Sequence, residues 1–585
     1  MPNNYDNPRI ILFDHFLETW LAFSRPLTVV AVHQTHEVLA ALRAVEEEVA
    51  QGKWAAGFIT YEAAAAFDAA LAVHEDGSGL PLLWFGIFDA PQSISAPSII
   101  EEQTILAWQA SIDVEKYNTG FNQIKEHIAR GDSYQVNYTF RLHAPFQGKS
   151  EDLFARAVHA QGSGYPGFVD LKDWSIASAS PELFFTLDGE KLISKPMKGT
   201  APRGLRLADD LKMAEWLKLS EKNRAENVMI VDMVRNDMGR IARVGSVKVP
   251  KLFDVEKYRT VWQMTSTVEC ETAASVCEIF QALFPAASIT GAPKARTMQI
   301  IKELEGNPRR IYTGTLGYIA PGRQAQFNVA IRTALVDKRS GQVEYGLGGG
   351  IVWDSEQNDE FREAYTKANI LTQTHPQFSL LETILWSPDS GYELLDRHLN
   401  RMEDSAQYFD FAFNVDEIRR TLADLANQFH AGENTIPKNQ RVRLCVNAEG
   451  EIEIETYELK PLPTPYRIRL ADKPISGQNP FLFHKTTFRK MYQKSDCKCC
   501  DDILLWNELG EVTESTIANL VVVKKGEWIT PPVHCGLLPG TARAQWLSDG
   551  KIREAVIRVD ELADCEEIYL LNSVRGLWKV ELINS

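Results

Sequence analysis

Pro376 divides this 585-residue chain into two parts with different patterns. Before it, the segment EFREAYTKANILTQT has helical spacing of apolar residues, and the position preceding a proline disfavours helix. After it, a strand pattern begins at Phe378. A chain of this length also exceeds what one hydrophobic core organises. We therefore predict two α+β domains, 1–373 and 378–585, joined at about residues 373–377.

Composition narrows the class of protein. The net charge of −16 and the pI near 5.4 argue against nucleic acid as the main partner. There is no apolar run of the length that spans a membrane, and the first residues lack the pattern of a signal peptide. Cys497, Cys499 and Cys500 are spaced too tightly for the usual zinc knuckle. We interpret them as reduced cysteines in a loop of a cytoplasmic protein.

The stretch KPMKGTAPRG places Lys198 beside Gly199 and Thr200 between two prolines. Proline fixes the backbone angle φ and opposes regular helix, so the stretch is predicted to be a strand end that enters a rigid loop. A solvated surface lysine is the ordinary interpretation of such a residue. The rest of the chain changes that interpretation.

Two predicted helices carry carboxylates on their inward faces. In the segment 220–241, Glu226 shares a face with Ile230, and in DEFREAYTKANIL, Glu360 and Glu363 share another face. An inward carboxylate is costly unless a cation neutralises it. A buried salt bridge to arginine is one solution, and a Mg²⁺ ion that leaves places for substrate oxygens is another.

Segments between these helices are suited to binding an anion. The glycines at 348–350 allow backbone amides to approach a ligand closely, although a glycine-rich strand end is more often a tight turn. Arg332, at a predicted strand end, can grip a carboxylate with two hydrogen bonds.

Residues 115–370 resemble the chorismate-utilising enzyme family. The matching segments, in family order, are GDSYQVNY, SPELFF, KGTAPRG, AENVMIVDMVRNDMGR, SITGAPK, YTGTLGY, AIRT, GGGIVWDS and EFREAYTKA. The resemblance implies an α/β sandwich like that of anthranilate synthase component I. It also implies Mg²⁺ held by Glu226, Glu363 and Glu360. The implied substrate-binding residues are Thr200, Thr290, Gly291, Tyr312, Arg332, Gly348, Gly349, Gly350 and Lys367.

Two positions indicate the branch of the family. Isochorismate and salicylate synthases have a lysine base where this chain has Gln135, and anthranilate synthases usually have alanine at the position of Lys198. Lys198 matches aminodeoxychorismate synthase component I, in which the lysine amine is the nucleophile. Lys198 is expected to attack C2 of chorismate while Glu182 protonates the departing C4 oxygen. Ammonia then enters at C4 and expels the lysine.

The chain departs from the family in several places. Gln263 stands where many relatives have histidine, and the first 110 residues match only loosely, so we predict no inhibitory tryptophan site there. The chain has no cysteine nucleophile elbow of a glutamine amidotransferase. Ammonia is therefore expected from solution or from a separate glutaminase subunit.

The second half contains another lysine in a specific setting. Lys485 lies in FLFHKTTFRKMY after a strand-like run, and Glu514 is expected at a turn between strands. The segment GLLPGTAR runs into a predicted amphipathic helix, whose first amides can seat an anion. An edge-strand lysine is the ordinary alternative for Lys485.

With RHLNRMEDSAQYF and IYLLNSVRGL, these segments resemble the fold-type IV pyridoxal phosphate enzymes, such as D-amino acid aminotransferase, over about residues 378–580. The resemblance implies that Lys485 binds pyridoxal phosphate covalently and carries protons. Glu514 is implied to pair with the pyridine nitrogen. The implied phosphate-binding residues are Arg401, Ile517, Thr541 and Ala542, although relatives often have a hydroxyl residue in place of Ala542. Such relatives often form dimers.

The two resemblances together predict a bifunctional enzyme of 4-aminobenzoate synthesis in the folate pathway. The first domain would convert chorismate and ammonia to 4-amino-4-deoxychorismate, and the second would release pyruvate from it as a lyase. One alternative is an anthranilate-type synthase joined to a branched-chain or D-amino acid aminotransferase. Another is an inactive regulatory or scaffolding subunit.

Overall fold

The computed structural model describes residues 8–98, 106–372, 376–431, 438–492 and 500–583. The chain divides into two compact units, residues 1–203 with 213–375 and residues 204–212 with 376–585. Cys497 and Cys499 of the predicted cysteine loop lie outside the described residues. In the described part of the chain, no helix is long and apolar enough to cross a membrane.

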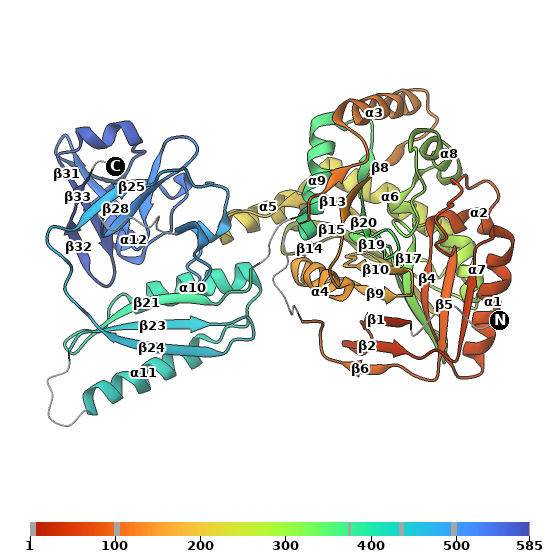
Figure 1. Cartoon of the computed structure of the whole chain (residues 1–585), viewed down its shortest axis with the longest axis horizontal. Helices are drawn as coiled ribbons and strands as arrows, with labels where there is room; N and C mark the ends of the chain where they lie inside the picture. The colour runs from red at the N-terminus through yellow and green to blue at the C-terminus, as the bar shows by residue number, and fades with distance from the viewer. Residues whose placement is uncertain (1–7, 99–105, 373–375, 432–437, 493–499, 584–585) are drawn as a thin grey trace. The chain divides into compact units, whose positions relative to one another are not determined.

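Two antiparallel sheets form the centre of the first unit (Figure 1). In spatial order, the first sheet consists of β16 (Gly291–Ala292), β8 (Gln135–Pro145), β20 (Gln342–Ile351), β19 (Thr333–Asp337), β10 (Trp174–Ser178), β9 (Gly167–Asp170), β1 (Arg9–Asp14), β2 (Thr19–Ser24) and β6 (Gln92–Ile94), with β7 (Gln109–Ala110) beside β8. The second sheet consists of β13 (Met197–Pro202), β15 (Val261–Glu271), β12 (Lys191–Lys195), β11 (Leu183–Asp188), β18 (Gln324–Asn328), β17 (Thr315–Ala320), β4 (Trp54–Ile59), β5 (Leu83–Phe88) and β3 (Thr28–Val32), with β14 (Lys248–Lys257) beside β15.

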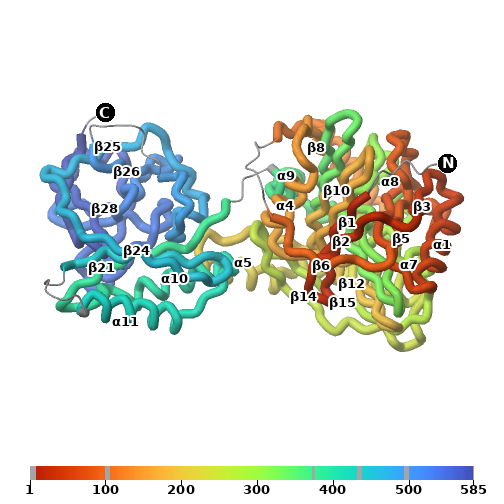
Figure 2. The backbone as a smooth tube through the Cα atoms, turned by 60° about the horizontal axis from the view of Figure 1, so that its bottom comes forward, coloured from red at the N-terminus to blue at the C-terminus, as the bar shows by residue number. Residues whose placement is uncertain are grey.

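The two sheets pack face to face through a cluster that includes Phe23, Phe58 and Trp84. Each such buried ring contributes about 2–3 kcal/mol to folding. Helices cover the outer faces, as Figures 1 and 2 show. The second sheet is covered by α1 (Val38–Ala50), α6 (Glu221–Gly239) and α7 (Val276–Leu283), and the first by α3 (Val114–Ala129), α4 (Ser150–Gln161), α8 (Lys294–Leu304) and α9 (Gln357–Thr372). The predicted α/β sandwich is confirmed.

Local sequence sets the start of α6, the helix that carries Glu226. The Ser220 hydroxyl caps the helix by accepting a hydrogen bond from the Asn223 amide at 3.4 Å. From this start, Ile230 and Val234 face the buried cluster, and the helix is fixed by their burial.

The second unit has two sheets of its own. A smaller sheet, in the order β22 (Gly391–Tyr392), β21 (Leu380–Ser387), β23 (Gln440–Val446) and β24 (Ile452–Glu458), packs against α10 (Leu395–Phe409) and α11 (Val415–Ala431). The larger sheet has the order β30 (Arg553–Glu554), β29 (Glu527–Thr530), β28 (Asn519–Lys524), β27 (Val512–Ser515), β26 (Asp502–Trp506), β25 (Arg467–Leu470) and β33 (Glu581–Leu582). Strand β31 (Glu567–Asn572) pairs with β28 and β32 (Gly576–Lys579), and α12 (Thr541–Ser548) contacts β31. The predicted α+β class is confirmed.

Candidate active sites

A cavity of about 370 Å³ in the first unit gathers residues from segments that are far apart in the sequence. Its wall includes parts of β13, α6, β20 and α9. The predicted site residues on this wall are Glu182, Lys198, Thr200, Glu226, Tyr312, Arg332, Gly348, Gly349, Gly350, Glu360, Glu363 and Lys367. The fold therefore brings the proposed nucleophile, acid and metal ligands to one place.

Two predicted substrate-binding residues are not on this wall. The Thr290 hydroxyl donates to the backbone carbonyls of Ala286 and Ala287, at 3.2 and 3.3 Å. Gly291 belongs to β16 and pairs with Val136 of β8. Their contacts with a substrate stay predictions.

Lys198 projects from β13 into the cavity. Its Nζ lies 3.7 Å from Oε2 of Glu226, and its backbone carbonyl accepts a hydrogen bond from Asn227 Nδ2 at 3.2 Å. A Cβ at Gly350 would lie 2.2 Å from the lysine Nζ. Glycine at position 350 therefore leaves the space that the amine occupies.

Two glutamines lie beside this lysine. Gln263 Nε2 donates to the Gly199 carbonyl at 3.0 Å and to the Thr200 hydroxyl at 3.1 Å, so it fixes the backbone that follows Lys198. The side-chain amide of Gln135 is fully buried, and neither of its polar atoms has a hydrogen-bond partner. An unpaired buried amide is costly to the fold, and Gln135 itself is not on the cavity wall.

Glu182 is placed to act as an acid. Its Oε1 accepts hydrogen bonds from the Ser288 hydroxyl at 2.6 Å and, more weakly, from the Met197 amide at 3.4 Å. Burial nevertheless raises the pKa of Glu182 to about 7. The carboxyl group is therefore largely protonated at slightly acid pH, as a proton donor must be.

This raised pKa predicts a stability difference for Glu182→Gln. The pKa of Glu182 in the folded state lies above the usual glutamate value of 4.5, so ionisation destabilises the folded state as pH rises from about 4.5 to about 7. The neutral amide removes this cost and keeps an acceptor for Ser288. We expect the variant to be more stable by about 3 kcal/mol above pH 8, with little difference at pH 4.5. Urea unfolding at both pH values measures this, and an equal difference at both would contradict the assignment.

Glu226, Glu360 and Glu363 fit the donor set of Mg²⁺, which prefers carboxylate oxygens. In the described residues these carboxylates do not form a closed cluster of three possible ligands. Instead Glu226 faces Lys198, Glu363 Oε1 pairs with Lys367 Nζ at 2.8 Å, and Glu360 accepts a hydrogen bond from the Ser355 hydroxyl at 2.6 Å.

Burial and the nearby Glu363 charge raise the pKa of Glu360. Burial alone would raise the pKa of Glu363, but its hydrogen bond to Lys367 and the charges of Lys367, Lys198 and Lys222 together lower that pKa. A cation that neutralises Glu360 would find acceptor oxygens on this wall.

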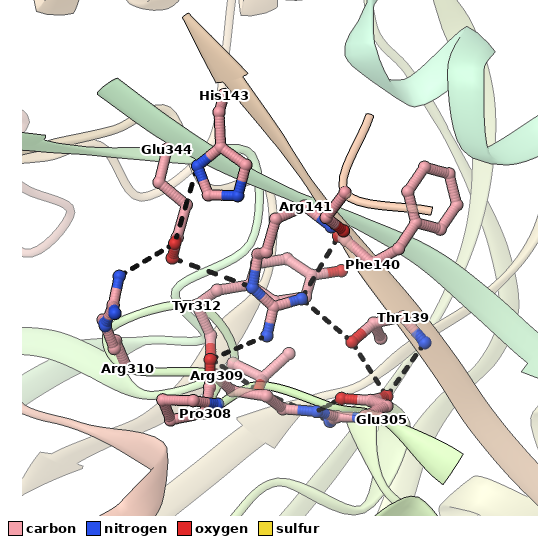
Figure 3. A network of polar contacts seen from close by, with 12 residues as sticks. Thr139, Phe140, Arg141, His143, Glu305, Pro308, Arg309, Arg310, Tyr312 and Glu344 are labelled. Carbon is pink, nitrogen blue, oxygen red and sulfur yellow. Dashed lines mark hydrogen bonds and ion pairs between the residues drawn. The ribbon is translucent and has the colours of Figure 1, made fainter. Parts of the chain in front are cut away.

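Figure 3 shows a buried polar network that includes Arg309, Glu305 and Arg141. Arg309 binds Glu305 with two hydrogen bonds, of 2.6 and 2.9 Å. The same guanidinium donates to the backbone carbonyls of Asn137 and Ile289, at 2.7 and 2.9 Å, and both residues line the cavity. Arg141 lies over the ring of Tyr312, 4.9 Å from its centroid. The network therefore fixes one wall of the site.

Removing Arg309 is expected to destabilise the first unit. Arg309→Ala leaves the carboxylate of Glu305 buried without its cation, which costs about 3–5 kcal/mol. The exposed pair of Arg243 and Glu271 provides the control, since Arg243→Ala is expected to cost about 1 kcal/mol or less. Denaturant unfolding of both variants checks this, and equal losses would mean that the buried pair contributes no more than a surface pair.

A second cavity, of about 330 Å³, lies in the second unit. Its wall includes the predicted residues Arg401, Lys485, Glu514, Ile517 and Thr541. Ala542 is buried among apolar residues of α12 and the larger sheet and is not on this wall. Its predicted phosphate contact stays a prediction.

Lys485 is held beside β21, although not by the strand that the sequence predicted. Pro480–Leu482 form a 3-10 turn capped by the Asn479 side chain, because proline is favoured at such a start. The Lys485 carbonyl accepts from the Leu381 amide at 3.0 Å. Burial and the charge of Arg401 lower the pKa of Lys485 to about 8. More of the lysine is therefore neutral near physiological pH than in water.

Glu514 lies within β27 rather than in a turn. Its Oε1 accepts hydrogen bonds at 3.0 Å from the Tyr492 hydroxyl and from the Leu538 amide, and its Oε2 accepts from Asn519 Nδ2 at 3.0 Å. Burial raises the pKa of Glu514 to about 7. A buried carboxyl group poised to share a proton fits a partner for a pyridine nitrogen.

Arg401 is oriented by a carboxylate that sequence analysis missed. It binds Glu382 with two hydrogen bonds, of 2.7 and 2.8 Å, and donates to the Pro539 carbonyl at 3.0 Å. His398 Nδ1 lies 2.6 Å from the same carboxylate, and its Nε2 lies 3.2 Å from the Thr541 hydroxyl. Arg401, Thr541 and the start of α12 thus form a cationic seat that fits the phosphate of pyridoxal phosphate. Glu382 could have been noticed as a lone carboxylate in the apolar run SLLETIL.

Comparisons with known proteins agree with this geometry. Residues 15–373 match the model of the chorismate binding enzyme family, and residues 379–583 match that of amino-transferase class IV. The chain therefore belongs to the chorismate binding enzyme family and carries a class IV aminotransferase-like domain.

Among individual relatives, the chain is 39% identical over 264 residues to aminodeoxychorismate synthase component 1 of Escherichia coli strain K12, covering 45% of this chain and 58% of that protein. It is 35% identical over 288 residues to anthranilate synthase component 1 3 of Haloarcula marismortui, covering 48% of this chain and 57% of that protein. The matched region thus spans less than two thirds of the length of each of these relatives. The crystal structure of anthranilate synthase component I from Streptococcus pneumoniae shares the fold, with a TM-score of 0.51 and 24% identity over 64% of this chain and 93% of that one.

Proposed function

We propose that this chain converts chorismate and ammonia to 4-aminobenzoate and pyruvate in two reactions, one in each unit. The observation that supports the first reaction best is that Lys198 and the protonatable Glu182 line the same cavity as three carboxylates. The second unit contributes Lys485, Glu514 and an anion seat in a separate cavity.

In the first reaction, the neutral Lys198 amine attacks C2 of the chorismate ring, and Glu182 donates its proton to the C4 oxygen, which leaves as water. Ammonia then forms a bond to C4, and the bond between Lys198 and C2 breaks. The product is 4-amino-4-deoxychorismate, and the lysine is regenerated. The raised pKa of Glu182, about 7, keeps a larger share of this carboxyl group in the proton-donating form near neutral pH than in water.

Mg²⁺, held by Glu226, Glu360 and Glu363, would neutralise the ring carboxylate of chorismate. Arg332 and Lys367 supply fixed positive charge on the same wall. Arg332 is buried and its Nη1 donates to Gln161 Oε1, so its guanidinium is positioned before substrate arrives.

Pyridoxal phosphate, when bound in the second cavity, supplies an electron sink. Arg401, Thr541 and the Ile517 amide would hold its phosphate, and Glu514 would hold a proton at the pyridine nitrogen. Lys485 would remove the proton from C4 of aminodeoxychorismate and assist loss of pyruvate, which leaves an aromatic ring.

The ammonia source and the assembly are part of the proposal. The relatives named component 1 favour a separate glutaminase component that supplies ammonia. We further propose that the second unit forms a homodimer and that the enzyme is cytoplasmic.

The test is an assay of the purified chain with chorismate, ammonium and Mg²⁺. We expect 4-aminobenzoate and equimolar pyruvate without any second protein. Anthranilate in place of 4-aminobenzoate would support an anthranilate-type synthase. This is the main alternative, because the similar proteins include both aminodeoxychorismate synthases and anthranilate synthases. No turnover of either chorismate or supplied aminodeoxychorismate would support an inactive scaffolding subunit.

A further inference from the structure

Four arginines besides Arg401 line the second cavity, and they differ in what they contact. Arg443 forms an ion pair with Glu455, and Arg489 donates to the Thr516 carbonyl while facing the Tyr492 ring. The charge of Arg489 also favours the ionised form of nearby Glu514, so each of these two guanidinium groups lies near a carboxylate. The other two, Arg441 and Arg575, differ from them.

Arg441 and Arg575 are cations without a carboxylate partner among the described residues. Arg441 extends from β23 with its guanidinium 4.6 Å from the centre of the Tyr457 ring. Arg575 follows β31 and is oriented by one hydrogen bond, from Nη1 to the Lys460 carbonyl at 2.8 Å. Arg441 reaches the cavity wall from β23, and Arg575 reaches it from the turn between β31 and β32.

The two charges are close enough to affect each other. Burial, followed by the positive charge of Arg441, lowers the pKa of Arg575. Like charges on one wall repel and destabilise the fold unless an anion lies between or beside them. Planar guanidinium groups favour a carboxylate, which can accept two parallel hydrogen bonds.

We propose that Arg441 and Arg575 form a carboxylate-binding site that selects a dicarboxylate amine as the substrate of the second cavity. This inference rests on the proposed lyase function. Aminodeoxychorismate carries two carboxylates in addition to its amine, whereas a simple amino acid such as alanine carries one. Arg441 takes one of the two substrate carboxylates and Arg575 takes the other, while Arg401 binds Glu382 and would bind the cofactor phosphate.

The experiment compares Arg441→Gln, Arg575→Gln and the double variant with the unchanged chain, all loaded with pyridoxal phosphate. Arg419→Gln is the matched control, because Arg419 lies on α11 and pairs with Asp396 at the surface. Calorimetry measures the dissociation constants of 4-aminobenzoate and of pyruvate, each of which carries one of the two carboxylate types. Steady-state kinetics with supplied aminodeoxychorismate measure KM and kcat.

We expect each single substitution to weaken the binding of one of the two ligands and to raise KM by about 10-fold, with kcat changed far less. The loss of one charge-assisted hydrogen bond has an effect of about this size. Cofactor absorbance and affinity should not change.

Unchanged dissociation constants and KM in Arg441→Gln, whose exposed position tolerates substitution, would overturn the proposal. Loss of cofactor affinity in place of substrate affinity would also overturn it, because the pair would then bind phosphate. If the unchanged chain releases no pyruvate from aminodeoxychorismate, the proposed lyase function fails, whereas ligand binding still tests the arginine site.

Discussion

Lys198→Ala should reduce the formation of aminodeoxychorismate by about 10³-fold or more, the scale of losing a catalytic nucleophile. Without the amine, ammonia must displace the C4 hydroxyl directly, and hydroxide is a poor leaving group. The lyase reaction on supplied aminodeoxychorismate should be unchanged, because Lys485 lies in the other cavity. Product formation from each substrate, followed separately, gives both rates.

Lys195→Ala is the matched control for this experiment. Lys195 lies on β12, the strand that precedes β13 in the chain, and pairs with Glu256, but it does not line the cavity. We expect its synthase rate to stay within a few-fold of the unchanged chain. Equal rates of aminodeoxychorismate formation by Lys198→Ala and Lys195→Ala would show that Lys198 takes no part in the reaction.

Lys485→Ala should abolish the covalent attachment of pyridoxal phosphate and reduce pyruvate release by about 10³-fold or more. The unchanged chain should be yellow, and borohydride should fix the cofactor on the peptide that contains Lys485. The lowered pKa of Lys485, about 8, favours this reaction because the neutral amine is the reactive form. Absorbance and peptide mapping after reduction measure the attachment.

Lys524→Ala, on β28 and paired with Glu561 at 3.3 Å, provides the comparison for Lys485. It should keep the cofactor and the lyase rate. A Lys485→Ala protein that retained cofactor after reduction and dialysis would contradict the assignment, since another group would then hold the aldehyde.

The sequence predicted the sandwich and most of the first site because its motifs fix local structure. The spacing of Glu360 and Glu363 places both carboxylates on one face of α9, and Gly350 of β20 is needed where Lys198 approaches. These contacts form within short segments or between family motifs, so they can be predicted from the sequence alone.

The features of the two sites that the sequence did not predict depend on side chains that come into contact only after folding. Nothing near Glu182 in the sequence indicates that Ser288 donates to it, and the pair of Arg309 and Glu305 resembles an ordinary helical i, i+4 pair until its burial is known. The strand predicted before Lys485 was wrong because Pro480 begins a 3-10 turn. Thr290 and Ala542 follow family motifs, yet neither lies on the cavity wall.

The most direct test of covalent catalysis by Lys198 is peptide mass spectrometry of the chain quenched during turnover of chorismate without ammonia. The peptide that contains Lys198 should gain the mass of chorismate less water, and addition of ammonium before quenching should remove the adduct. If that peptide never carries an adduct, and Lys198→Arg forms aminodeoxychorismate at the original rate, the proposed mechanism is wrong.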